Sequence, residues 1–130
     1  MRGFLDTNVL LYLNSPNDTK CLITAKLLKN EGVISVQVLN DYCAVSRRKG
    51  SQSWDTISQR CDDLIQLLDV CDLTIDGQIL ARGYAARYGY TIYDANILAS
   101  AKLAGCDSLW TEDMQHGQVI DGVEIVNPFL

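Results

Sequence analysis

The stretch GFLDTN, residues 3–8, decides the fold of this chain. Its first three residues form a short apolar run that stops at a carboxylate, a pattern typical of a buried strand. Asp6 or Thr7 then provides the N-cap of a helical segment over residues 8–13. A strand that leads directly into a helix is the repeating unit of α/β domains, so this stretch predicts the first strand of a parallel sheet.

The same alternation of strands and helices continues along the sequence. We expect further strands at residues 33–35, 73–75, 108–110 and 123–126, and helices over 19–29, 37–49, 53–68, 76–88 and 94–104. Asp76 is the expected N-cap of the helix over 76–88. In the helix over 53–68, three- and four-residue spacing predicts one core-facing stripe, made of Trp54, Ile57, Cys61, Leu64 and Leu68. The pattern predicts an α/β domain with a mostly parallel sheet.

Length and composition limit the possible classes of protein. The chain has 130 residues, nearly half of them hydrophobic, so residues 1–130 are expected to form one domain with its own core. Five cysteines, an odd number without a C-x-x-C pair, and a single histidine argue against disulfides and zinc. Charges interrupt every apolar run, so we expect no membrane association and a cytoplasmic location.

The net charge of −5 does not favour non-specific binding of nucleic acid, which usually leaves a basic surface. An acidic protein can still bind a phosphodiester where its carboxylates hold cations, because bound cations reverse the local field. The basic residues Arg47, Arg48 and Lys49 form one candidate contact for RNA phosphates. The alternative is a solvated helix end, since cations suit a helix C-terminus.

Four carboxylates stand at positions where acids are uncommon unless they are paired or bind a metal. Asp6 and Asp113 follow predicted strands, Asp94 lies in the first turn of a helix, and Asp41 flanks an apolar helix face. Each acid alone also suits an ordinary role as a cap, turn or solvated residue. Together they would repel one another without cations, and oxygen ligands without His or Cys favour Mg²⁺ or Mn²⁺.

Four segments, in this order, resemble the motifs of PIN-domain nucleases, specifically the VapC toxins of bacterial toxin–antitoxin pairs. They are FLDTNVL at residues 4–10, SVQVLNDY at 35–42, YDANI at 93–97 and LWTEDMQHG at 109–117. The resemblance extends over essentially the whole chain. It implies a three-layer α/β/α sandwich with a central parallel sheet and an endoribonuclease that depends on Mg²⁺ or Mn²⁺.

The resemblance also implies roles and partners. The implied catalytic residues are Asp6, Asp41, Asp94 and Asp113. The implied metal-binding acids are Asp6, Asp94 and Asp113. The supporting residues are Thr7 or Asn8, which would orient Asp6, and Thr111 in the last motif. Apart from the resemblance, Glu112 is a candidate for an extra ligand or an outer-shell role because it neighbours Asp113, and a solvent-facing role is the alternative. The expected partners are an RNA substrate, with transfer RNA as one class, a cognate antitoxin and a second copy of the chain.

Asp41 departs from the family pattern. The family usually has Glu after the Asn of this motif, and Asp is one methylene shorter, a change to which metal sites are sensitive. Two hypotheses therefore remain: a working nuclease, or a non-catalytic PIN-like module that binds RNA or protein.

A phosphate-transfer protein is a third hypothesis. An aspartate-nucleophile phosphatase usually needs a second Asp two residues after the first, where this chain has Asn8. A receiver domain needs an acidic pair at the first strand and a late Lys. Here one Asp ends the strand, and the last lysine, Lys102, lies in the middle of a predicted helix.

Overall fold

The computed structural model describes residues 2–14 and 16–130. Its centre is a six-stranded sheet with the order β3-β2-β1-β4-β6-β5. The strands are β1 (Gly3–Leu5), β2 (Gly32–Ser35), β3 (Asp69–Cys71), β4 (Ser108–Trp110), β5 (Val119–Ile120) and β6 (Val123–Val126). The pairings are parallel except that β5 runs antiparallel to β6. The predicted mostly parallel sheet is confirmed.

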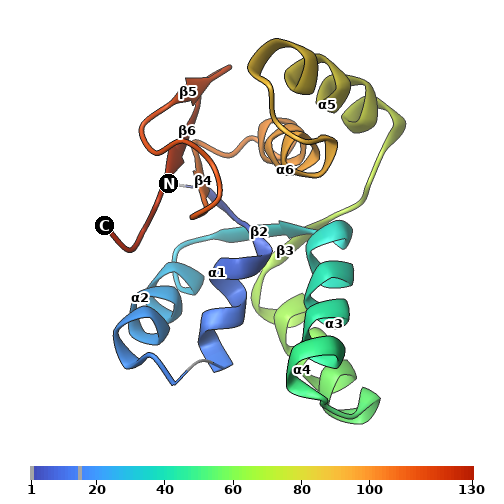
Figure 1. Cartoon of the computed structure of the whole chain (residues 1–130), viewed down its shortest axis with the longest axis vertical. Helices are drawn as coiled ribbons and strands as arrows, with labels where there is room; N and C mark the ends of the chain where they lie inside the picture. Colours follow the sequence, from blue (N-terminus) through green and yellow to red (C-terminus); the bar gives the residue numbers. More distant parts are fainter. Residues whose placement is uncertain (1, 15) are drawn as a thin grey trace.

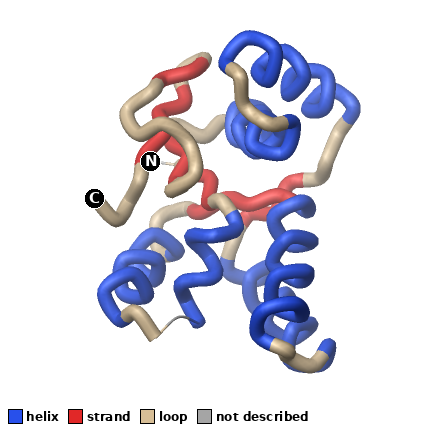
Figure 2. The backbone as a smooth tube through the Cα atoms, in the orientation of Figure 1, coloured by secondary structure: helices blue, strands red, loops and turns tan. Residues whose placement is uncertain are grey.

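The helices cover both faces of this sheet (Figure 1). On one side lie α1 (Thr7–Leu11) with the 3₁₀ turn η1 (Tyr12–Asn14), α2 (Asp18–Leu28), α3 (Val36–Gly50) and α4 (Trp54–Leu67). On the other side lie α5 (Ile75–Tyr88) and α6 (Ile92–Leu103). Figure 2 shows the strands between these two helical layers. The chain therefore has the expected three-layer α/β/α architecture.

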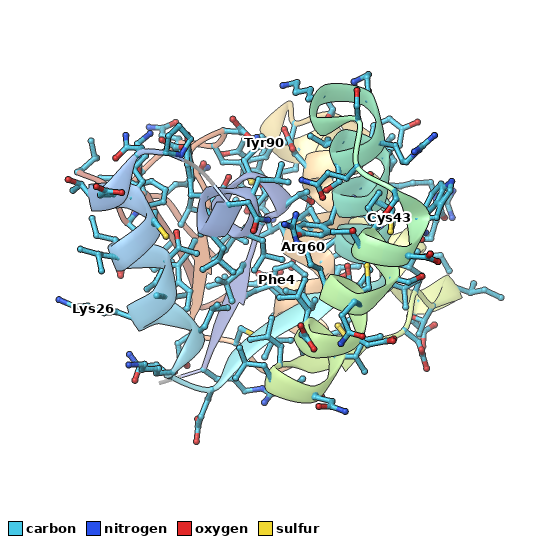
Figure 3. All side chains as sticks on the ribbon, turned by 90° about the horizontal axis from the view of Figure 1, so that it is seen from below. Phe4, Lys26, Cys43, Arg60 and Tyr90 are labelled. Atoms are coloured by element: carbon cyan, nitrogen blue, oxygen red, sulfur yellow. The ribbon has the colours of Figure 1, made fainter. Side chains whose placement is uncertain are left out.

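The sheet is centred on β1, which pairs with both β2 and β4. Phe4 lies opposite Val33 on one side and Leu109 on the other, and all three side chains are fully buried. Figure 3 shows Phe4 in the interior, between the helices. Gly3 is needed for close packing, because a Cβ there would lie 2.3 Å from the ring of Trp110. The predicted strand at residues 3–5 is confirmed, and it occupies the middle of the fold.

The cap of α1 follows from the same stretch of sequence. The backbone of Asp6 is extended, and its side chain accepts a hydrogen bond from the Thr7 amide. Ser35 and Thr91 cap α3 and α6, each accepting a hydrogen bond from the amide three residues further on. Asp6 directly follows β1, and Ser35 is the last residue of β2, so the helices α1 and α3 both start at the carboxyl edge of the sheet.

Two predictions near residue 75 are wrong. The third strand lies at Asp69–Cys71 instead of 73–75, and α5 begins at Ile75 with Thr74, not Asp76, as its N-cap. The apolar side chain of Ile75 misled the prediction, because it is 80% exposed and lies outside the sheet. The edge strand β3 has only half-buried or exposed side chains, so it lacks an apolar signature.

The predicted core stripe of α4 is only partly correct. Ile57, Leu64 and Leu68 are buried, but Trp54 is 57% exposed. Trp54 opens the helix at the connection from α3, which lies away from the sheet (Figure 1). There its ring packs against the Arg47 guanidinium, 5.6 Å from the ring centroid.

The five cysteines carry free thiols. Cys43 on α3 faces Cys61 on α4, with 3.5 Å between the two Sγ atoms, and Figure 3 shows Cys43 at this helix contact. Among the described residues, no helix combines the length and the apolar character that crossing a membrane requires.

Candidate active site

The ends of two neighbouring strands bring the first and last motifs together. Asp6 follows β1, and Thr111 follows β4, which lies parallel to β1 in the sheet. The Thr111 hydroxyl donates to Asp6 Oδ2 at 2.8 Å and accepts a hydrogen bond from the Asp113 amide at 3.1 Å. The Asp6 amide in turn donates to the Trp110 carbonyl at 3.0 Å. Asp6 and Asp113 are therefore held next to one another by the sheet itself.

Thr7 and Asn8 extend this network in different directions. The Thr7 amide donates to Asp6 Oδ1 at 2.7 Å, so both carboxylate oxygens of Asp6 have a donor. The Asn8 side-chain amide donates to Asp113 Oδ2 at 2.6 Å. Thr7 thus orients Asp6, while Asn8 orients Asp113. The Thr7 hydroxyl is buried, and it has no hydrogen-bond partner among the described residues.

An open pocket of about 280 Å³ collects the four carboxylates that the sequence singled out. Asp94 reaches it from the first turn of α6, and Asp41 reaches it from α3. The pocket is lined by Asp6, Thr7, Asn8, Asp41, Ala44, Val45, Arg48, Asp94 and Asp113. Below, it is called the carboxylate pocket. Strand ends and helix starts at one edge of the sheet position its acids, as expected for parallel α/β sheets.

The carboxylate pocket makes negative charge unfavourable. Burial raises the pKa of Asp6 to about 6, and the charges of Asp113 and Asp94 add to this effect. The hydrogen bonds from Thr111 and Thr7 act in the opposite direction. Burial, together with the charge of Asp113, also raises the pKa of Asp94. Bound cations would relieve this repulsion and favour the ionised acids.

Asp41 is exposed, as are Asp113 and Arg48 in the same pocket. It lies on the outer face of α3, and burial raises its pKa while a hydrogen bond with Gln37 lowers it. Gln37 also donates to the Tyr93 carbonyl, at 3.4 Å, at the start of α6. Gln37 therefore links Asp41 to the helix that carries Asp94. Gln37 lies in the second sequence motif, but no role had been predicted for it.

The donor set fits a hard divalent cation. Within residues 2–14 and 16–130, no three His, Cys, Asp or Glu side chains are arranged to hold one ion together. The four acids thus line the pocket without closing into a cage. Mg²⁺ is commonly bound through one or two carboxylates while it keeps several waters. The unpartnered Thr7 hydroxyl adds another oxygen in this pocket.

A PIN domain model matches residues 3–120 of this chain. The chain belongs to the PIN domain family. No curated protein matches it. The PIN membership that the four motifs indicated is confirmed, and the phosphate-transfer hypothesis has no support.

Solved structures share the fold of this PIN domain. A toxin–antitoxin complex from Klebsiella pneumoniae is 21% identical, with 97% of both chains covered and a TM-score of 0.73. VapC20 of Mycobacterium tuberculosis, described as a sarcin–ricin loop cleaving toxin, is 20% identical over 85% of this chain and 91% of its own, with a TM-score of 0.66. VapBC2 from Rickettsia felis, bound to promoter DNA, is 21% identical over 96% and 97%, with a TM-score of 0.69.

Glu112 of the PIN domain is engaged outside the carboxylate pocket. Its carboxylate accepts from Lys20 Nζ at 2.8 Å, and Lys20 also donates to the Tyr12 hydroxyl at 3.1 Å. Burial would raise the pKa of Glu112, but the hydrogen bonds from Lys20 and Tyr12 hold it below its ordinary value. Sequence reasoning missed Lys20, because a partner 92 residues away leaves no local signal.

The three basic residues at the end of α3 have different surroundings. Arg48 lines the carboxylate pocket, and Lys49 lines a neighbouring pocket. Arg47 instead donates to the Gln52 carbonyl at 2.7 Å and packs on Trp54. The structure therefore places Arg48 and Lys49, but not Arg47, beside the acids.

Proposed function

We propose that this PIN domain, with residues 1–130 forming one domain, is a cytoplasmic endoribonuclease that depends on Mg²⁺ or Mn²⁺. The observation that carries the proposal is Asp6, a buried carboxylate with its pKa raised to about 6, in one pocket with Asp41, Asp94 and Asp113. A cluster of this kind is stable in its ionised form only with cations present. Family membership supports the reading as a nuclease.

Each residue has a defined task in this proposal. Asp6, Asp94 and Asp113 would hold the ions, and Asp41 would contribute from α3. When bound, the ions supply an activated water and neutralise charge on the phosphodiester. Thr111 and Thr7 orient Asp6, and Asn8 orients Asp113. Arg48 provides a positive charge at the rim, where the RNA backbone would enter.

The second candidate function is a PIN-like module that binds RNA or protein without cleaving it. Two observations favour it: Asp41 is the shorter acid, and no three acids among the described residues converge on one point. The longer side chain of Glu at position 41 would extend further into the open pocket. The nuclease therefore predicts Asp6-dependent cleavage by the wild type and by Asp41→Glu, whereas the binding module predicts cleavage by neither.

We further propose that the chain is the toxin of a toxin–antitoxin pair and forms a homodimer. The structural neighbours from Klebsiella pneumoniae and Rickettsia felis are toxin–antitoxin assemblies, which supports a cognate antitoxin. Large apolar side chains on α5 and α6 support burial against a second copy: Ile75 is 80% exposed and Leu103 is 55% exposed. Structured RNA, including transfer RNA, is the proposed substrate class.

Cleavage of structured RNA with Mn²⁺ tests the proposal. We expect cleavage by the wild type, loss of at least about 100-fold in Asp6→Asn, and wild-type activity in the exposed control Asp62→Asn. Asp41→Glu should keep or increase the activity, by up to about tenfold. Absence of Asp6-dependent cleavage in both the wild type and Asp41→Glu would leave the binding module as the function.

A further inference from the structure

A second open pocket lies directly beside the carboxylate pocket. Its volume is about 400 Å³, within the range of about 300–1,000 Å³ that small-molecule sites occupy. It is lined by Asn8, Leu11, Tyr12, Val45, Lys49, Glu112 and Asp113. Asn8, Val45 and Asp113 line both pockets. A ligand in this side pocket would therefore adjoin whatever the carboxylate pocket holds.

The walls of the side pocket are mostly polar, with a smaller apolar part. Leu11 and Val45 supply the apolar part. The Tyr12 ring is held edge-to-face against Phe129, with 5.1 Å between centroids, and Lys20 Nζ lies 4.4 Å from its centroid. Because these contacts hold the wall in place, little ordering is needed on binding. An aromatic ring and apolar side chains beside several hydrogen-bonding groups suit a flat heteroaromatic ligand, whose face can stack and whose edge can form hydrogen bonds.

Charge in the side pocket also suits a nucleotide. Lys20 pairs with Glu112, and that pair and the Arg2–Asp69 pair are the salt bridges among residues 2–14 and 16–130. Lys49 thus has no carboxylate partner in the described part of the chain. It faces the pocket as an available cation, while the charge of Glu112 is already offset by Lys20.

We propose that the side pocket receives the base of a nucleotide next to the scissile phosphate, and that guanine fits it best. This inference rests on the proposed ribonuclease function. Unpaired RNA bases are recognised in such pockets through their edges. Lys49, from α3, can donate to guanine O6 or N7. The Glu112 carboxylate, from the loop after β4, can accept from the guanine N1–H and amino groups.

Nucleotide binding by NMR tests the pocket without requiring catalysis. Metal-free protein is titrated with GMP, AMP, CMP, UMP and, as a probe without a base, ribose 5-phosphate. We expect GMP to shift the amide signals of Tyr12, Val45 and Lys49, with a Kd at least about threefold below that of UMP. Lys49→Met should weaken GMP binding about fivefold or more. The matched control Lys26→Met, whose side chain projects outward from α2 (Figure 3), should not.

Equal affinity for GMP, UMP and ribose 5-phosphate, or GMP shifts centred on other residues, would overturn the inference. Glu112→Gln provides a second variant, and it should reduce the preference for GMP over UMP. Sequencing of cleavage ends separates the two proposals. Cleavage without a preferred base beside the cut contradicts the side pocket alone. GMP binding by the wild type without any Asp6-dependent cleavage contradicts the nuclease alone.

Discussion

The Thr111 hydroxyl donates a hydrogen bond to Asp6 Oδ2 at 2.8 Å, although the two residues are 105 positions apart in the chain. The same hydroxyl oxygen accepts from the Asp113 amide. One buried side chain thus joins the acid at the end of β1 to the loop after β4. Together with the hydrogen bond from the Asn8 side-chain amide to Asp113 Oδ2, this bridge positions Asp113 in the carboxylate pocket.

Thr111→Val removes both hydrogen bonds while keeping the shape of the side chain. The hydrogen bond from Thr111 lowers the pKa of Asp6, so we expect the pKa of Asp6 in the variant to rise further above about 6. Leaving the Asp113 amide without its partner should also cost about 1–3 kcal/mol of stability. Carboxyl ¹³C NMR titration and urea unfolding measure the two effects. Thr111→Ser should preserve both values, and an unchanged Asp6 pKa in Thr111→Val would refute the role of the bridge.

The raised pKa of Asp6 makes stability depend on pH in a defined direction. Folding raises this pKa from about 3.8 to about 6, so the folded state binds the proton more tightly than the unfolded state. The stability gained from protonated Asp6 is present below pH 4 and is lost as the pH rises through 6. Asp6→Asn cannot ionise, so in EDTA at pH 7.5 it should be the more stable protein, by up to about 3 kcal/mol.

Thermal unfolding in EDTA and with added Mn²⁺ measures this effect. Mn²⁺ should raise the Tm of the wild type, because a ligand that binds only the folded state stabilises it. It should leave the Tm of Asp6→Asn nearly unchanged. In EDTA, the Tm difference between the wild type and Asp6→Asn should be larger at pH 7.5 than at pH 4.5. An equal difference at the two pH values would contradict the raised pKa of Asp6.

Arg48 and Arg47 form a matched pair of neighbours in different surroundings. Arg48 lines the carboxylate pocket, while Arg47 packs on Trp54. We expect Arg48→Ala to weaken RNA binding and to reduce the slope of log affinity against log salt by about 1, since one phosphate contact is lost. Arg47→Ala should leave that slope unchanged. Both slopes are measured by filter binding of RNA between low and moderate salt, with each arginine variant made in the inactive Asp6→Asn protein. Equal slopes in the two variants would show that Arg48 makes no phosphate contact.

Lys20 and Glu112 are expected to act as a pair. Lys20→Met leaves the half-buried carboxylate of Glu112 without its cation, and Glu112→Gln leaves the ammonium without its anion. Each change should lower the urea midpoint, and the charge-swapped protein Lys20→Glu with Glu112→Lys should recover part of the loss. High salt should reduce the difference in urea midpoint between the wild type and each single variant, because salt screens the ion pair. The pair does not contribute to stability if the changes in urea midpoint of Lys20→Met and Glu112→Gln are additive and the charge-swapped protein recovers none of the loss.

Much of the fold could be predicted because its signals are local. The apolar run at residues 3–5 followed by a capping carboxylate predicts both β1 and α1, and the run at 108–110 predicts β4. The strand β3 could not be placed, because its edge position leaves it without an apolar run. The two-residue strand β5 depends on a turn at Asp121 and Gly122 with positive φ angles of 50° and 83°, and on its pairing with β6. Two residues carry no periodicity that a sequence could reveal.

The carboxylate pocket could be anticipated for a related reason. Asp6 and Asp113 follow parallel strands, whose carboxyl ends meet at one edge, and they do line one pocket. Their hydrogen-bond partners were less accessible to sequence reasoning. Asn8 contacts Asp113, and Lys20 contacts Glu112, across separations of 105 and 92 residues. Such contacts follow from tertiary packing, and no local pattern specifies them.

Anomalous diffraction from crystals soaked in Mn²⁺ tests the central claim most directly. We expect an anomalous peak in the carboxylate pocket, within ligand distance of at least one of Asp6, Asp94 and Asp113, and no such peak in Asp6→Asn crystals grown in the same way. Full Mn²⁺ occupancy elsewhere on the molecule, with none between these acids in the wild type, would contradict it.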